Sequence, residues 1–202
     1  LRGGATSLRL IGAICINLGD LDHAASSLRR GLEIARRIGN IEEVGGCLIN
    51  LGVAEEKRGN FAEAARNARR ALEEFERIGH GAGRATAASN LATALIQQGN
   101  DAEAATYARA ALELAQNIGH TPIVADSLQT LASLDLRHGS PLSAAESAER
   151  AAALWGQIGE AERAAEALDA AAAAWDAAGD GVRAADARAR ASEGVRAAKP
   201  SD

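Results

Sequence analysis

The chain has 202 residues, of which 47% are hydrophobic but only 2% aromatic, and its formal net charge is −5 at pH 7. An acidic balance with no basic face argues against direct nucleic-acid binding by this segment. No apolar run reaches the ~20 residues that a membrane-spanning helix requires, so we predict no membrane partner. Alanine supplies much of the hydrophobic content, so we expect closely packed helices with small contact residues.

The N-terminal stretch shows no signal peptide, and the two cysteines, Cys15 and Cys47, stand in helical patterns of neighbouring segments. We interpret both as buried free thiols in a reducing compartment, rather than as a disulfide, and predict a cytoplasmic location. Methionine is absent even at position 1, and the chain begins inside a repeating pattern. Both features suggest a piece of a longer polypeptide.

Glycine recurs every 40 residues in two series, one from Gly19 to Gly179 and one from Gly39 to Gly159. A fixed period in this range indicates a repeat array. The hydrophobic pattern of each repeat predicts two helices joined by a short turn. We therefore expect a single domain over residues 1–202, with repeats at about 1–40, 41–80, 81–120, 121–160 and 161–199.

In the first two repeats we expect helices over about 5–18, 21–38, 41–58 and 61–78. Asn40 and Asn60 each stand three residues before a glutamate and are predicted to cap the helices that follow them. Gly45 and Gly46 weaken the third helix by up to ~1 kcal/mol each relative to alanine. Close approach of a ligand would explain them, but we favour tight packing on the first repeat.

His80 and His120 share one repeat position at helix termini, where capping is a better explanation than metal binding. On the second helix of the second repeat, Glu73 and Arg77 are spaced for an i,i+4 ion pair on a solvated face. The two tryptophans, Trp155 and Trp175, are expected to pack between the late helices. The last helix is rich in arginine, as expected of a terminal helix with water on its outer side.

These spacings resemble the tetratricopeptide repeat (TPR). In the second repeat Leu48, the pair Leu51-Gly52, Ala64 and Ala71 stand at the motif positions of the family, and the other repeats carry related residues at the same offsets. A period of 40 rather than 34 residues is similar to that of kinesin light chains, polarity adaptors and large bacterial ATP-dependent transcriptional regulators. High use of alanine and arginine, with little lysine, favours the regulators. The resemblance implies an all-α fold, a right-handed superhelical solenoid of five antiparallel two-helix repeats.

No arrangement of residues typical of an enzyme is present. The glycine-rich segment 79–83 lacks the Lys-Ser/Thr of a phosphate-binding loop, and neither a His-Glu-x-x-His nor a Cys-x-x-Cys pattern exists to bind zinc. We therefore predict that the chain is not an enzyme and needs no cofactor or metal.

The resemblance implies that the first helix of each repeat lines a concave groove for a protein or peptide. In the longer-repeat relatives, asparagines in the register of Asn50 and Asn90 hold the backbone of an extended peptide, a task that suits an amide because it both donates and accepts. Thr130 occupies the same register. The alternative is that the asparagines tie adjacent helices together. Further groove candidates follow by register: Arg9, Asn17, Ile49, Val53, Lys57, Ser89, Thr93, Gln97, Gln129, Ser133 and Arg137.

The sequence thus predicts a protein- or peptide-binding scaffold that serves as the sensor or interaction module of a larger bacterial regulatory protein. Two alternatives remain open. One is a self-association module that forms homo-oligomers, and the other is a domain that binds a small-molecule effector in the groove.

Overall fold

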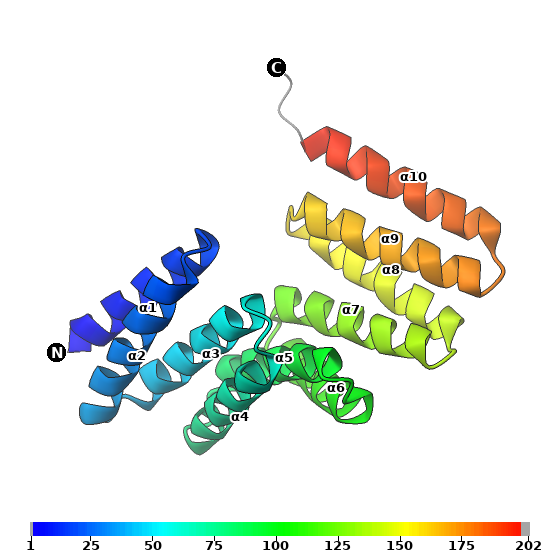
Figure 1. The fold of residues 1–202 in the computed structure, drawn as a ribbon. Coiled ribbons are helices and arrows are strands. Elements are labelled where there is room, and N and C mark those ends of the chain that lie inside the picture. The colour runs from blue at the N-terminus through cyan, green and yellow to red at the C-terminus, as the bar shows by residue number, and fades with distance from the viewer. Residues whose placement is uncertain (1, 199–202) are drawn as a thin grey trace. The chain divides into compact units, whose positions relative to one another are not determined.

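The computed structural model describes residues 2–198, which form ten α-helices joined by short turns (Figure 1). The helices are α1 (Arg2–Asn17), α2 (Leu21–Arg37), α3 (Ile41–Lys57), α4 (Phe61–Arg77), α5 (Gly81–Gln97), α6 (Asp101–Asn117), α7 (Thr121–Arg137), α8 (Pro141–Gln157), α9 (Ala161–Ala177) and α10 (Gly181–Ala198). The predicted order of helices is confirmed. The first helix starts at Arg2 rather than at residue 5.

Each turn is closed by a glycine in the left-handed region, which is why the helices end one residue earlier than predicted. After α2, for example, Gly39 has φ +68°. The Asn40 N–H donates to the carbonyl of Ala35 at 2.9 Å, and the Gly39 N–H donates to Arg36 at 3.1 Å. This arrangement satisfies the last carbonyls of the helix and stops it. Glycine adopts a positive φ at little cost because it has no Cβ.

Side chains cap several helix starts. The Glu43 N–H donates to the Asn40 side chain at 3.2 Å, and His80 Nδ1 accepts from the Gly83 N–H at 2.9 Å, so both predicted caps are confirmed. His120 accepts in the same way from Ile123. The prediction for Asn60 is wrong. Its side-chain amide donates to Glu55 Oε2 at 2.8 Å instead, because that buried carboxylate needs a donor.

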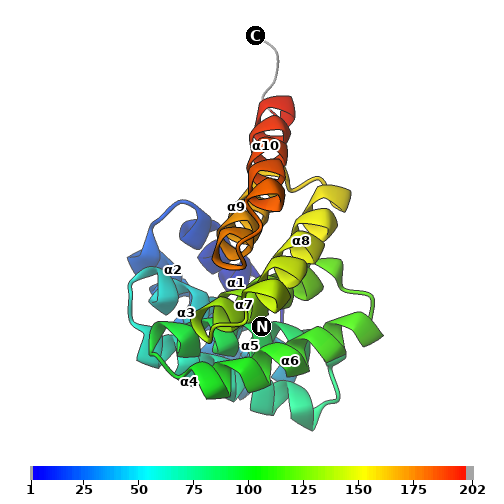
Figure 2. The same ribbon diagram turned by 90° about the vertical axis from the view of Figure 1, so that its right-hand side faces the viewer.

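The chain divides into two compact units, Leu1–Leu114 (unit 1) and Ala115–Asp202 (unit 2), with the boundary inside α6. In the described part of unit 1, α1 contacts α3 and α3 contacts α5, whereas α2 and α4 do not contact each other. The stack in unit 1 therefore curves toward an inner row made by α1, α3 and α5, with α2 and α4 in an outer row. In unit 2, α7 likewise contacts α9, and the helices from α8 to α10 pack in succession (Figure 2).

Glycine makes room for the few large side chains of the unit 1 core. A Cβ on Gly45 of α3 would lie 2.5 Å from Phe75, and one on Gly83 of α5 would lie 2.4 Å from the same ring. A Cβ on Gly46 would lie 2.9 Å from Arg9 Cδ. Gly46 thus packs on the first repeat as predicted. For Gly45 the predicted neighbour is wrong, because it accommodates an aromatic ring of its own repeat.

Both tryptophans are buried in unit 2, as predicted. Trp155 is 1% exposed and Trp175 is 2% exposed. Their indole N–H groups donate to Gln129 Oε1 at 2.7 Å and to Glu149 Oε1 at 3.1 Å. The guanidinium of Arg163 lies 3.5 Å above the Trp155 ring, close enough for a cation–π interaction. These contacts join α7, α8 and α9.

On the outer row, the predicted i,i+4 pair between Glu73 and Arg77 is wrong. Arg77 pairs with Glu74, one turn away at i,i+3, at 2.6 Å. Both cysteines are free, as predicted, but only Cys47 is buried, whereas Cys15 is partly exposed. None of the helices within the described residues is long and apolar enough to cross a membrane.

Candidate functional site

Asn50 and Asn90 occupy equivalent positions on the two adjacent inner helices α3 and α5. Both side chains are half-buried, and neither amide is hydrogen-bonded to another described residue. In the described residues they therefore do not tie the helices together through hydrogen bonds. Each offers a donor and an acceptor to a ligand.

The neighbouring predicted residues make a largely uncharged surface. Ile49, Val53 and Thr93 are half-buried, and the Thr93 hydroxyl donates to the Ser89 carbonyl at 3.2 Å. Ser89 itself is only 7% exposed, so its side chain contributes little accessible surface. Further predicted residues, exposed at or near the C-terminal ends of α1, α3 and α5, are Asn17, Lys57 and Gln97.

Arg9 is not a free cation. Its Nε donates to Glu43 Oε2 at 2.9 Å, and its side chain is 29% exposed while that of Glu43 is 13% exposed. The Thr6 hydroxyl donates to the same carboxylate at 3.1 Å. This ion pair joins α1 to α3 and neutralises the positive charge that the sequence places on the surface.

Glu56 is a residue of α3 that the predictions from sequence missed. It follows Val53 by three residues, so it lies one turn further along the same side of the helix. The side chain is half-buried, and burial raises the pKa of its carboxyl, while the charge of Lys57 opposes the shift. The sequence signal that could have identified Glu56 is its spacing of three residues from Val53, which is itself a predicted groove residue. Glu56 gives this neutral surface one anionic group.

The remaining predicted residues lie on α7 in unit 2. The Gln129 amide oxygen is engaged by Trp155, Thr130 is half-buried, and Ser133 and Arg137 are exposed. One turn before Gln129, Asp126 forms an ion pair with Arg163. Burial raises the pKa of the Asp126 carboxyl, and the charge of Arg163 opposes this. The side chains of Gln129 and Asp126 on α7 thus already have partners within unit 2.

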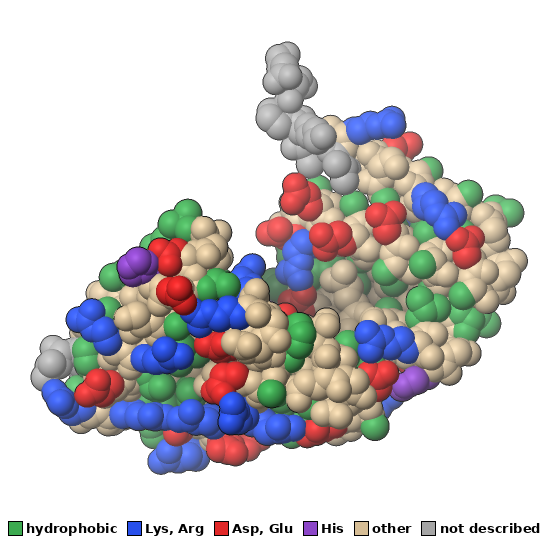
Figure 3. All heavy atoms as spheres, viewed as in Figure 1, with side chains coloured by type: hydrophobic (Ala, Val, Ile, Leu, Met, Phe, Trp, Pro, Cys, Tyr) green, Lys and Arg blue, Asp and Glu red, His purple; other side chains and the backbone are tan. Residues whose placement is uncertain are grey.

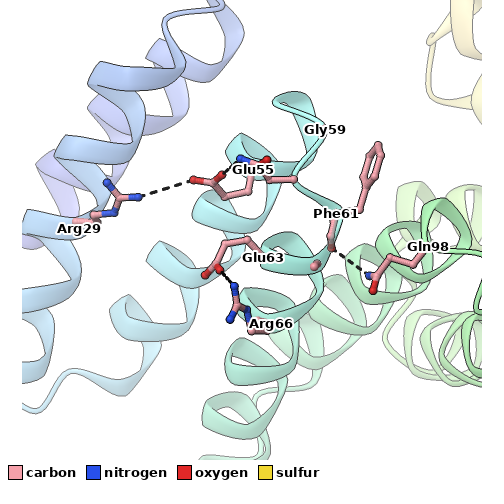
Figure 4. A pocket seen from close by; sticks show the side chains of 9 residues that line it. Arg29, Glu55, Gly59, Phe61, Glu63, Arg66 and Gln98 are labelled. Atoms are coloured by element: carbon pink, nitrogen blue, oxygen red, sulfur yellow. Dashed lines mark hydrogen bonds and ion pairs between the residues drawn. The ribbon is translucent and has the colours of Figure 1, made fainter.

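A hollow of about 620 Å³ lies elsewhere in unit 1, where the turn between α3 and α4 faces α2 (Figure 4). Its buried carboxylate, Glu55, is 5% exposed and accepts from Arg58 at 2.9 Å and from Asn60 at 2.8 Å. Glu63 pairs with Arg66 at its rim. Because these charges are already paired, they form a structural ion-pair network. The residues that line the hollow are not those of the predicted groove.

No group of three or more His, Cys, Asp or Glu side chains within the described part of the chain is placed to hold a metal ion. Figure 3 shows basic side chains gathered along the lower edge of unit 1, with acidic ones among them. The acidic and basic residues of unit 1 balance, so the net charge of −5 belongs to unit 2.

Solved structures share this fold. BtubC (BKLC) from P. vanneervenii matches with a TM-score of 0.83 and 23% identity, over 96% of this chain and 81% of that chain. A Rap protein complexed with Competence and Sporulation Factor matches with a TM-score of 0.80 and 15% identity, over 94% of this chain and 53% of that chain. These similarities confirm the predicted all-helical solenoid of antiparallel helix pairs.

A more distant structural match is a Signal Transduction ATPase with Numerous Domains (STAND) protein with a tetratricopeptide repeat sensor, from Pyrococcus horikoshii. Its TM-score is 0.71 at 20% identity, over 85% of this chain and 27% of that chain. This chain therefore spans about a quarter of the STAND protein and about half of the Rap protein. No curated protein sequence matches it significantly.

Sequence profiles described as "Tetratricopeptide repeat" match residues 44–117 and 83–157, and a further one matches residues 5–38. The matches cover more than half of the chain, which therefore belongs to the tetratricopeptide repeat family of protein-interaction scaffolds.

Proposed function

We propose that this chain binds an extended peptide segment of a partner protein on the inner row of unit 1. The observation that carries the proposal is the pair Asn50 and Asn90, repeated on adjacent inner helices with amides that bond to no other described residue. A peptide backbone presents alternating donors and acceptors. Two amides one repeat apart can hydrogen-bond to this backbone, and these bonds do not depend on which side chains the peptide carries.

The surroundings of the two asparagines support this ligand class. The nearby surface is neutral and partly apolar, because Arg9 is paired with Glu43 and Ile49 and Val53 are half-buried. Glu56 adds one carboxylate that lacks a hydrogen-bonding partner among the described residues. We propose that the bound segment carries a basic side chain near Glu56. The inner row is preformed, which lowers the ordering cost of binding.

The test begins with selection of binding peptides from a random display library against the unaltered chain. Asn50→Ala together with Asn90→Ala is expected to weaken binding of a selected peptide at least about tenfold, since each lost hydrogen bond is worth about 1 kcal/mol. The helicity and melting temperature should stay nearly unchanged. Asn117→Ala, an exposed asparagine at the end of α6, is the matched control. Unaltered affinity in the double variant would contradict the proposal.

We also propose that this module is the sensor part of a larger bacterial regulatory protein located in the cytoplasm. Two similarities support this role. The Rap structure holds the Competence and Sporulation Factor, and the STAND protein carries a tetratricopeptide repeat sensor. An ATPase or helix-turn-helix segment in the same polypeptide would support it, and a full-length protein with neither would contradict it.

A further inference from the structure

The hollow beside Glu55 separates two residues of opposite charge that do not pair with each other. Arg29 extends into it from α2 on one side, and Glu63 from α4 on the other (Figure 4). The Arg29 side chain is 69% exposed, and it donates no hydrogen bond to a described residue. Its guanidinium is therefore open to a ligand.

The equivalent residues one repeat later meet directly. Forty residues after Arg29 and Glu63 stand Arg69 of α4 and Glu103 of α6. Arg69 Nη2 donates to Glu103 Oε1 at 2.6 Å, which bridges the two outer helices. The same two residue types at the same register are thus joined in one place and held apart in the other.

Two further charges explain why Arg29 and Glu63 stay apart. Arg29 lies 3.8 Å from the carboxylate of Glu55. Arg66 pairs with Glu63 through Oε2, and Glu63 Oε1 accepts no hydrogen bond from the described residues. One repeat later the positions of Glu55 and Arg66 hold an uncharged leucine and threonine. The hollow therefore presents a cationic donor on one wall and an anionic acceptor on the other.

This arrangement of charges selects among ligand classes. A simple anion beside Arg29 would also lie near the carboxylates of Glu55 and Glu63. A simple cation beside Glu63 would also lie near Arg29 and Arg66. Placing like charges side by side opposes binding in both cases. A zwitterion avoids the conflict, because its carboxylate can face Arg29 while its ammonium faces Glu63. It would complete the bridge that Arg69 and Glu103 make directly.

The hollow has room for a ligand of this kind. Its volume of about 620 Å³ is in the range of small-molecule sites. Uncharged residues complete its lining, among them Ala62 and Gln98. The Gln98 amide nitrogen donates to the carbonyl of Phe61 at 3.1 Å, so the amide oxygen stays as an acceptor for a polar side chain of the ligand.

We propose that this hollow binds a free α-amino acid, with the carboxylate on Arg29 and the ammonium on Glu63. The site lies between the outer helices α2 and α4. It shares no residue with the peptide surface around Asn50 and Asn90, so either proposal can fail alone.

Nuclear magnetic resonance titration of the isotope-labelled chain with each standard L-amino acid in turn tests the site. We expect at least one to shift the backbone amides from Gly59 to Arg66, with a dissociation constant of about 1 mM, since the charges are at the surface. The N-acetyl and the C-terminal amide derivatives of that amino acid should each bind at least about tenfold more weakly, because each lacks one of the two charges. No shift in this segment with any amino acid at about 10 mM would overturn the proposal.

Two variants test the assigned contacts. Arg29→Ala and Glu63→Ala should each weaken binding of that amino acid at least about tenfold. Arg30→Ala, at the exposed neighbouring arginine of α2, is the matched control and should leave the affinity unchanged. The melting temperature of Arg29→Ala should match that of the unaltered chain, because the side chain is mostly exposed. Equal affinity in Arg29→Ala, or equal binding of the N-acetyl derivative or of the amide, would contradict the two-point site.

Discussion

Ser127 of α7 is fully buried, and its hydroxyl oxygen has no hydrogen-bond partner among the described residues. The equivalent positions of the second, third and fifth repeats hold Cys47, Ala87 and Ala167, each 0% exposed, whereas Ser7 of the first repeat is exposed. The interface at this register is therefore built for a small apolar side chain, and Ser127 places an unsatisfied polar group in it.

Ser127→Ala is predicted to stabilise the chain by about 1 kcal/mol, the lower end of the cost of an unsatisfied buried polar group. Urea unfolding followed by circular dichroism measures the change. Ser133→Ala, at an exposed residue of the same helix, should leave stability unchanged. A loss of stability in Ser127→Ala would show that the hydroxyl has a partner in solution.

Cys47 is buried whereas Cys15 is partly exposed, and we predict that the two thiols differ in reactivity for this reason. Burial raises the pKa of the Cys47 thiol to about 11, and only the thiolate is a good nucleophile. At pH 8 we predict that a thiol reagent modifies Cys15 in the native chain and modifies Cys47 only after unfolding. Mass spectrometry of labelled peptides reads out both sites. Equal labelling of the two cysteines in native protein would contradict this.

Glu56 gives stability a pH dependence. Burial raises the pKa of its carboxyl above the ordinary 4.5, so ionisation costs the folded state more than the unfolded one. The penalty is fully present above the raised pKa and is removed as the pH falls through it toward 4.5.

Glu56→Gln should therefore raise the melting temperature at pH 7, and the gain should shrink as the pH approaches about 4. Thermal scans at both values measure it, with Glu33→Gln, an exposed glutamate of α2, as the control. A gain of the same size at both pH values would contradict the assignment.

At the scale of the helix, the packing of Phe75 explains two glycines that local propensity disfavours. In Gly83→Ala, the added methyl would lie 2.4 Å from the ring, so we predict a loss of about 1–3 kcal/mol despite the better helix propensity of alanine. Gly156→Ala, in α8, would place its methyl group with nothing within 4 Å, and it should be neutral or slightly stabilising. Chemical denaturation compares the two.

Phe75→Leu in the Gly83→Ala background should recover part of the loss, since it removes the clash. If Gly83→Ala were as stable as the unaltered chain, the close approach of Phe75 to α5 would be wrong.

The helices and turns were largely predictable because the 40-residue period and the turn residues recur in every repeat of the sequence. Turn glycines at one spacing, followed by short capping side chains, fix where helices stop and start. Asn60 departs from that local pattern, because its side-chain amide donates to the carboxylate of Glu55, five residues earlier. Likewise, nothing in the spacing of Gly45 shows that Phe75 is its neighbour, since that contact depends on how two helices pack.

At the scale of the whole molecule, the family was predictable and the ligand surface only in outline. Register alone places Asn50 and Asn90 on one row, but it cannot show that Glu43 neutralises Arg9 or that Trp155 engages Gln129. The first contact joins neighbouring repeats and the second joins the two helices of one repeat, so both depend on pairs of residues far apart in sequence.

The most direct test of the peptide-binding account is hydrogen–deuterium exchange of the chain with and without a selected peptide. We predict added protection in the middle of α3 and α5, around Asn50 and Asn90, and none in the outer helices α2 and α4. Protection confined to α2 and α4, or to the hollow beside Glu55, would contradict the account.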